Sequence, residues 1–461
     1  MPASGVPEGR GVCVCSIKRR ALRGPLPGDR SLRERSEERD PVPDSRTRSD
    51  ERRRLGFAGV PTMAFYPDLD PPAPEPEPAA APERSEGPLV THALCYNDVM
   101  ASALEHVAWE PCLVDPHPDR ALDSYARRKT GIPVPSIRYF ASVPWLARAL
   151  VDLHPEYGLL IHLDQNVADL LILVVSQENS CRFCYAAQRA LLWGQGMSEA
   201  RIQRVEQELS AGLAPRAAAA IAFGRAQSRI GPAGARDALQ ALRRAGFGDD
   251  EMKEIAFTVA ATDFFNRAHT IPAIPARPLE RIPDQVHMRL LRPLINRILQ
   301  RHRFRGRPTP LERTPSYPYA RTIEKYAGSP IAPVLGGAIE EMWASSHLTR
   351  RCKLLMLAVI ARGLGCEVCA LEIGNVLKHE GLNERALARI LTHLDAGELD
   401  DIERLLVRFA RETIWFDPAA LQRRARTLSE RLSVPQLLEA IGVTSLANGL
   451  CRMGAMVMGH S

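Results

Sequence analysis

The sequence predicts an all-α protein, and three observations support this fold class. Helix-favouring alanine, leucine and arginine are abundant, whereas aromatic residues make up only 6% of the 461 residues. Alternation of apolar and polar residues is nearly absent, and so are the Asn-Gly and Asp-Gly pairs typical of hairpin turns. Successive stretches instead carry apolar residues at helical spacing between capping residues. We therefore expect tandem helical domains preceded by a disordered N-terminal segment.

Length and charge limit the functions that the chain can have. At 461 residues it is long enough for two or three domains, each with its own core. The net charge is +6, but residues 1–62 alone carry fourteen Lys/Arg and nine Asp/Glu, which accounts for +5 of it. The rest of the chain is close to neutral, so we expect no nucleic-acid partner. No stretch approaches 18 consecutive apolar residues, so we expect no membrane partner.

Residues 1–90 are expected to form a disordered leader rich in Arg and Pro. The tract 71–86 of Pro, Glu and Ala favours extended, solvated conformations. Met63 is an alternative start of translation within this leader. The first twenty residues lack the apolar segment and cleavage site of a secretory signal, so we expect a cytoplasmic protein.

Residues 91–285 are predicted to form the first helical domain. Its expected helices cover residues 97–108, 143–153, 164–176, 217–229, 233–245 and 249–267. Pro133 and Pro135 break the chain after the first helix, and Ser198 is expected to cap another helix. Residues 170–175 have the composition of a buried strand. We assign them to helix because the corresponding stretch 353–362 is richer in helix formers.

Residues 286–330 are predicted to be a basic linker, and residues 331–461 a second helical domain. The part 287–305 is basic and carries Leu and Ile, and the part 307–318 is rich in proline. Such a basic segment can bind an anionic partner or a membrane surface. We interpret it instead as a linker helix with solvated arginines.

A pair of cysteines is the strongest functional signal in the chain. Cys181 and Cys184 lie three residues apart at the predicted opening of a helix. At this spacing two Cβ atoms are about 5–6 Å apart, which a small adjustment brings within disulfide distance. The macrodipole and the unpaired N–H groups of a first helical turn favour a thiolate there. Two such thiols can attack an oxidant and then close to a disulfide.

The same pair recurs later in the chain. Cys366 and Cys369 lie 185 residues after Cys181 and Cys184. Glycines, helix-start residues and the end of a late helix keep this offset: Gly196 and Gly381, Glu199 and Glu384, Asn266-Arg267 and Cys451-Arg452. A repeat of this kind predicts a duplicated domain.

These residues resemble the alkylhydroperoxidase AhpD-like / carboxymuconolactone decarboxylase superfamily. Its members are all-helical domains in which a Cys-x-x-Cys begins a helix, and Asn266-Arg267 is similar to the end of a late helix in peroxidase-related members. In the peroxidase branch a His follows the second Cys by four residues and a Glu precedes the first Cys by twelve. Members assemble as trimers or hexamers, so the resemblance implies a homo-oligomer of two AhpD-like domains per chain.

The resemblance assigns roles to four residues of the first copy. Cys184 would be the nucleophile that attacks a hydroperoxide, and Cys181 the thiol that resolves it to a disulfide. Asp169 stands at the Glu position. Gln188 stands at the His position, where an amide cannot titrate near pH 7. Glu178, three residues before Cys181, could substitute as a carboxylate, but we expect it to be solvated.

The implied activity is a thiol-dependent peroxidase-like oxidoreductase of low turnover. It reduces hydroperoxides through a dithiol/disulfide cycle and needs an external dithiol reductant protein. The resemblance implies no cofactor and no metal.

The second copy is expected to be degenerate. Leu354 and Ile373 occupy the Glu and His positions beside Cys366 and Cys369, so this pair can form a disulfide but should turn over poorly. The remaining cysteines of the helical part are expected to be small buried residues: Cys95, Cys112, Cys352 and Cys451.

Other functions fit the sequence less well. The alternative that stays open is a catalytically weakened family scaffold that acts as a redox-sensing or assembly protein. A zinc site would have to join Cys184 and Cys366 across domains, and a thioredoxin-like enzyme would need a strand before the motif. A Gly-x-Ser-x-Gly elbow is absent, and decarboxylase members generally lack the cysteine pair.

Overall fold

A computed structural model describes residues 104, 106–208, 213–230, 235–301, 305–311, 318–394 and 397–458, and the statements about the fold refer to these residues. They consist of helices and loops, with an isolated antiparallel bridge between Thr309 and Gly328. The predicted all-α class is therefore confirmed. The predicted leader 1–90, with Met63, lies outside the described residues, which fall within one unit, Ala93–Ser461.

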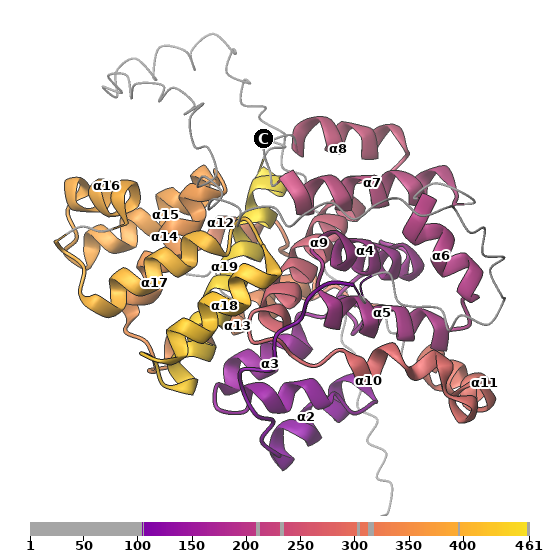
Figure 1. The fold of residues 1–461 in the computed structure, drawn as a ribbon. Helices are drawn as coiled ribbons and strands as arrows, with labels where there is room; N and C mark the ends of the chain where they lie inside the picture. The colour runs from indigo at the N-terminus through magenta and orange to yellow at the C-terminus, as the bar shows by residue number, and fades with distance from the viewer. Residues whose placement is uncertain are drawn as a thin grey trace, which may run out of the picture. The chain divides into compact units, whose positions relative to one another are not determined.

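The first half of this unit holds eight α-helices and one 3₁₀ helix among its described residues (Figure 1). They are α2 (Arg120–Thr130), η1 (Pro135–Phe140), α3 (Pro144–Asp152), α4 (Gln165–Glu178), α5 (Arg182–Gly194), α6 (Glu199–Glu208), α7 (Pro215–Ile230), α8 (Ala235–Arg244) and α9 (Asp249–Thr270). The helices predicted from residue 143 onward are confirmed to within a few residues. The predicted helix 97–108 lies mostly outside the described residues, and residues 106–108 are not helical.

Helix α2 was not predicted from the sequence, although its caps are regular. The Asp119 side chain accepts hydrogen bonds from two first-turn N–H groups, and Gly131 ends the helix at φ 76°. Only Leu122, Ala126 and Thr130 of α2 are buried. Because so few apolar residues mark its buried face, the helical spacing is hard to recognise in the sequence.

The rest of the described chain contains ten α-helices and one 3₁₀ helix. Its helices are α10 (Arg277–Glu280), η2 (Ile282–Asp284), α11 (Val286–Arg301), α12 (Ala320–Glu324), α13 (Ile331–Ala344), α14 (Arg350–Gly363), α15 (Glu367–His379), α16 (Glu384–His393), α17 (Asp401–Glu412), α18 (Pro418–Ser429) and α19 (Val434–Met458). The segment predicted as a linker therefore contains two helices. Helix α11 packs on α5, and α12 packs on α13 and α19.

The helix order repeats at a constant offset. Helices α14, α15 and α16 begin 185 residues after α4, α5 and α6 (350 − 165, 367 − 182, 384 − 199). A buried contact repeats with them. Glu254 of α9 accepts the Leu163 N–H at 2.6 Å, and Glu439 of α19 accepts the Leu348 N–H at 2.8 Å, each residue 185 positions after its counterpart. Both glutamates hold the loop that leads into the helix before the cysteine pair.

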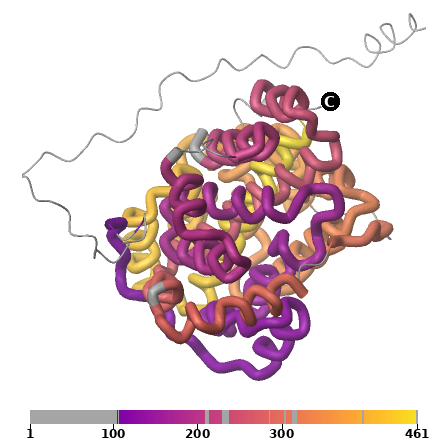
Figure 2. The backbone as a smooth tube through the Cα atoms, turned by 90° about the vertical axis from the view of Figure 1, so that its right-hand side faces the viewer, coloured from indigo at the N-terminus to yellow at the C-terminus, as the bar shows by residue number. Residues whose placement is uncertain are grey.

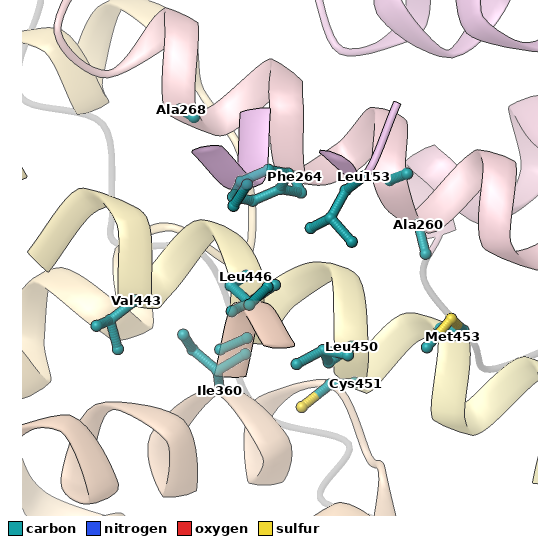
Figure 3. Close-up of a cluster of buried hydrophobic side chains, with 14 of the residues drawn as sticks. Leu153, Ala260, Phe264, Ala268, Ile360, Val443, Leu446, Leu450, Cys451 and Met453 are labelled. Carbon is teal, nitrogen blue, oxygen red and sulfur yellow. The ribbon is translucent and has the colours of Figure 1, made fainter. Parts of the chain in front are cut away.

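Helices α9 and α19 lie side by side at the centre (Figure 1). Figure 3 shows Ala260 and Phe264 of α9 facing Leu446 and Leu450 of α19 across an apolar interface. The backbones approach closely, because a Cβ added at Gly449 would lie 2.8 Å from the Ala260 carbonyl oxygen. Helix α19 is long and apolar enough to cross a membrane, but 89% of its most apolar stretch is buried inside the protein. It is therefore a central core helix.

A buried carboxylate crosses the α9–α19 contact. Asp263 is fully buried, and its Oδ1 accepts hydrogen bonds from Asn179 at 2.8 Å and from Arg267 at 3.2 Å. Its Oδ2 lies 3.5 Å from Nε of Arg452 on α19. Arg267 also donates to the Thr413 carbonyl at 2.9 Å, so each half of the chain contributes a guanidinium to the other half's polar groups.

Asp263→Asn should lower the free energy of unfolding by about 3–5 kcal/mol, because two buried guanidinium groups would lose their shared counter-charge. Urea unfolding followed by circular dichroism measures the change. Glu412→Gln is the matched control, since its ion pair with Arg424 is largely exposed and should contribute no more than about 1 kcal/mol. An equal effect of both substitutions would contradict a special role of Asp263.

Candidate functional site

The turn between α4 and α5 positions the first cysteine pair. The Cys181 N–H donates to the Ser176 carbonyl at 2.9 Å, and Ser180 just before it has φ 50°. The second copy repeats the turn. The Cys366 N–H donates to the Ala361 carbonyl at 3.0 Å, after Gly365 at φ 65°. In both copies a left-handed residue thus reverses the chain directly before the first cysteine.

Cys181 is the N-cap of α5, and Cys184 lies in its first turn. The Cys181 Sγ accepts the Cys184 N–H at 3.3 Å, as a capping oxygen would, and the two sulfur atoms are 2.7 Å apart. Capping therefore brings the two sulfur atoms closer together than side chains three residues apart inside a regular helix. Cys181 is completely buried, whereas Cys184 is partly accessible.

Cys184 opens onto a cavity of about 490 Å³. Its walls come from the loop after α2 and from α3, α4, α5 and α9, and from α10 to α11 on the outer side. Most of the lining is apolar, including Tyr139, Leu191, Phe265 and Leu299. A cavity of this size and character fits an apolar organic ligand better than a small polar one.

A few polar side chains share this cavity with Cys184. They include Gln188, Glu156, His154 and His269. The Gln188 Nε2 donates to Glu156 Oε1 at 3.3 Å and to the Asp169 carbonyl at 3.2 Å, so both hydrogens of its amide are used. Gln188 therefore holds a carboxylate at the cavity wall.

The two histidines are held neutral by burial. His269 Nδ1 lies 2.9 Å from the Phe265 carbonyl, which can only accept, so Nδ1 carries the proton and Nε2 is left as an acceptor. Burial lowers the pKa of His269 to about 4. Burial also lowers the pKa of His154, whose ring stacks on Phe265 at 5.2 Å between centroids.

His269 lies beside the cysteine helix. Its ring stacks on Phe183, between the two cysteines, with centroids 4.5 Å apart. In the second half of the chain, Gly454 stands at the corresponding position, 185 residues after His269. A Cβ added at Gly454 would lie 3.1 Å from Cys369 Sγ and 3.2 Å from Cys366 Sγ. The position equivalent to His269 therefore borders both sulfur atoms in the second copy.

The expected thiolate at the start of α5 is not what the structure favours for Cys184. Burial is the main cause that raises the pKa of this thiol well above its usual value, and the nearby Cys181 raises it further. The helix N-terminus does contribute an N–H to the pair, but desolvation of the charged form outweighs it. Cys184 is therefore a neutral thiol at pH 7.

Asp169 and Glu178 do not lie where a proton relay to Cys184 would need them. Asp169 is fully buried in α4, and it is not among the described residues that line the cavity; its carbonyl contacts Gln188. Glu178 was expected to be solvated, and this prediction is wrong. Its side chain is only 4% exposed and pairs with Arg225 at 3.0 Å, which ties α4 to α7.

The second pair is closed. Cys366 and Cys369 form a disulfide, both residues are buried, and Gly454 of α19 packs against the two sulfur atoms. Leu354 and Ile373 are fully buried beside them. Neighbouring Glu372 points away and accepts the N–H groups of Tyr319 and Arg321. This pair faces the protein core.

Elsewhere in the part of the chain that the structure describes, no three His, Cys, Asp or Glu side chains gather as a metal site would require. Cys352 and Cys451 are buried as expected, and Cys112 is half-buried. Cys95 lies outside the described residues.

Sequence reasoning missed Glu156, His154 and His269. The two histidines belong to α9 and to the loop after α3, far from the cysteine motif along the chain. The sequence contained one signal for His269, because the 185-residue offset aligns it with Gly454. This difference indicates a role only once the structure shows that Gly454 borders the second pair of sulfur atoms.

Alkylation of Cys184 by iodoacetamide should accelerate about tenfold for each pH unit between about pH 7 and 9, because the thiolate fraction rises in this way below a raised pKa. Mass spectrometry of the Cys184 peptide after timed quenching gives the rate. Cys352, whose thiol is buried away from the cavity, serves as the internal control and should stay unmodified. A rate that levels off below pH 8 would contradict the raised pKa.

The free energy of unfolding should decrease as the pH falls from about 6.5 towards 4. In this range the unfolded chain binds a proton at His269 and the folded chain does not, because the folded pKa is about 4. The full loss from this residue is about 3 kcal/mol. In urea titrations His269→Gln should flatten the dependence, whereas His393→Gln, at an exposed position, should keep the wild-type slope.

Comparisons of this chain with protein-family models, with curated proteins and with solved structures find no match. The family resemblance therefore depends on the residues of the chain itself.

Proposed function

We propose that the chain is a thiol-dependent peroxidase-like oxidoreductase of the AhpD-like kind, with its working site at Cys181 and Cys184. One observation carries this proposal. Two free thiols have their sulfur atoms 2.7 Å apart, and one of them, Cys184, lines a large apolar cavity, whereas Cys181 is buried behind it. A substrate in the cavity meets Cys184 first, and Cys181 lies directly behind.

The proposed reaction has two steps at sulfur. Cys184 loses its proton and attacks the terminal oxygen of a hydroperoxide; an S–O bond forms, the O–O bond breaks, and the alkoxide takes up a proton to leave as an alcohol. The sulfur is oxidised by two electrons to a sulfenic acid. Cys181 then attacks this sulfur, so that an S–S bond forms and water leaves. An external dithiol protein reduces the disulfide and becomes a disulfide itself.

The proton of Cys184 needs an acceptor, and Gln188 cannot be one. We propose His269 in this role, since its Nε2 is an open acceptor, its ring stacks on Phe183, and it lines the cavity with Cys184. A neutral thiol beside a neutral imidazole gives a small thiolate fraction, which supports a low turnover. Glu156, held by Gln188, would orient the polar end of a substrate.

The second copy is proposed as a structural element. Its disulfide is buried and its neighbours are apolar, so an external reductant has no route to it. In the family picture two such halves build part of a ring, and we propose a cytoplasmic homo-oligomer by this analogy.

A second candidate is a redox-sensing or assembly scaffold without turnover. The raised pKa of Cys184 favours it, because a slowly reacting thiol can record sustained oxidation without consuming much peroxide. The two candidates differ in whether the disulfide is cycled by a dithiol donor.

Reduced protein with dithiothreitol as donor should consume cumene hydroperoxide catalytically, measured by loss of peroxide. Cys184→Ser should abolish the consumption, because it removes the atom that is oxidised. His269→Phe should lower the rate at pH 7 about 10²-fold, as expected for loss of a proton acceptor, and should do so less at pH 9.

Cys366→Ser is the matched control, since its sulfur lies in the closed copy, and it should keep the wild-type rate. If wild type and Cys184→Ser consume the peroxide equally slowly, the scaffold candidate replaces the enzyme. If Cys366→Ser lowers the rate in protein that remains folded, the activity depends on the second cysteine pair, and the proposal for Cys181 and Cys184 is wrong.

A further inference from the structure

Helix α11 forms the outer cover of the cavity. Met288, Ile295 and Leu299 on its inner side line the same cavity as Cys184. The helix is fastened to the end of α5, where Arg292 donates to the carbonyls of Trp193 and Met197 at 2.9 Å each. None of its residues is buried, and α10 and α11 lie at the periphery beside α5 (Figures 1 and 2).

The outer side of α11 carries five exposed large apolar residues among its polar ones. They are Val286 (71% exposed), Leu290 (78%), Leu291 (47%), Leu294 (56%) and Ile298 (38%). Only three other large hydrophobic residues of the described chain are exposed, and they belong to three separate helices or loops: Leu371, Trp415 and Val434. A solvated linker helix, as the sequence suggested, would turn polar residues outward. This concentration indicates a surface that something covers.

The charge of α11 is entirely positive. Its sixteen residues include four arginines and no Asp or Glu. Arg289, Arg297 and Arg301 are exposed around the apolar side chains, and Arg305 and Arg307 follow along the chain. Exposed leucines flanked by arginines on a single helix are the composition of helices that lie in the surface of an anionic bilayer.

We propose that α11 docks on an anionic lipid surface. The apolar side chains from Val286 to Ile298 would enter the boundary between headgroups and acyl chains, and the arginines would bind lipid phosphates. A second copy of the chain fits this face less well, because a two-fold contact of α11 with itself would set arginines against arginines. The proposal replaces the expectation, made from the sequence, that the protein has no membrane partner.

Docking in this position defines a substrate class. The inner side of α11 lines the cavity, so a membrane on its outer side lies only about one helix diameter, roughly 10 Å, from the cavity. The cavity is mostly apolar and about 490 Å³ in volume, which suits an acyl chain. Resting on the proposed peroxidase function, the substrates of Cys184 are hydroperoxides of lipid acyl chains supplied by the membrane.

Docking is tested by flotation of the full chain with phosphatidylcholine vesicles that contain or lack phosphatidylglycerol. Wild type and Cys184→Ser should both float with the anionic vesicles and not with the neutral ones, and salt raised to about 1 M should release them. Leu290→Ser/Leu294→Ser should bind the anionic vesicles at least about tenfold more weakly than wild type. Leu371→Ser/Trp415→Ser, which removes exposed apolar residues elsewhere, should bind like wild type.

Equal binding to neutral vesicles, no binding of wild type, or wild-type binding by Leu290→Ser/Leu294→Ser would overturn the proposal. If wild type forms an oligomer that does not bind vesicles and the double variant loses this oligomer, the proposal is also overturned, since the face would then belong to a second copy. Circular dichroism confirms that each variant is folded.

The substrate class is tested separately. Leu290→Ser/Leu294→Ser should reduce a phospholipid hydroperoxide in anionic vesicles about tenfold more slowly than wild type while reducing soluble tert-butyl hydroperoxide at the same rate. Equal rates on the vesicle substrate would overturn the substrate class. If wild type reduces neither peroxide, the peroxidase function fails and the substrate class fails with it, whereas flotation still decides the docking.

Discussion

The buried Asp263 carboxylate constrains the whole arrangement of helices. It has counter-charges from both halves, Arg267 on its own helix and Arg452 on α19, and neither guanidinium is solvated. Separating α9 from α19 would leave charges without partners in an apolar core, which is far more costly than the loss of an exposed pair. The same helix α9 carries Glu254 near its start and His269 near its end. The position of α9 against α19 therefore fixes two things: the loop before α4, through Glu254, and one wall of the cavity, through His269.

One repeated scaffold gives two different cysteine pairs. Both copies use the same turn, with a left-handed residue and the same backbone hydrogen bond before the first cysteine. What differs is the neighbouring space. In the first copy His269 stands at the α9 position and the second cysteine faces a cavity, whereas in the second copy Gly454 lets α19 close over the disulfide. The surroundings of each cysteine pair are thus set by residues outside the motif.

Burial acts on both partners of the proposed proton transfer. It raises the pKa of the Cys184 thiol and lowers the pKa of His269, so the neutral pair is the stable state at pH 7. The apolar wall that produces this effect is also what suits the cavity to an organic ligand. The fit of the cavity to an apolar ligand and a small resting thiolate fraction therefore have the same physical origin, desolvation. In the proposed peroxidase, a site built in this way would favour selectivity for apolar substrates over speed.

The sequence by itself determined the helical class, the predicted helices between residues 143 and 270, the 185-residue offset and the closeness of Cys181 and Cys184. These features depend on local spacing, on capping and on an offset that can be read along the chain. Tertiary structure alone decided that Cys184 lines a cavity with His154, Glu156 and His269, and that α11 exposes leucines on the outside of that cavity. Burial comes from packing between distant segments, so it could reverse the effect of the helix N-terminus on Cys184, which local sequence had suggested.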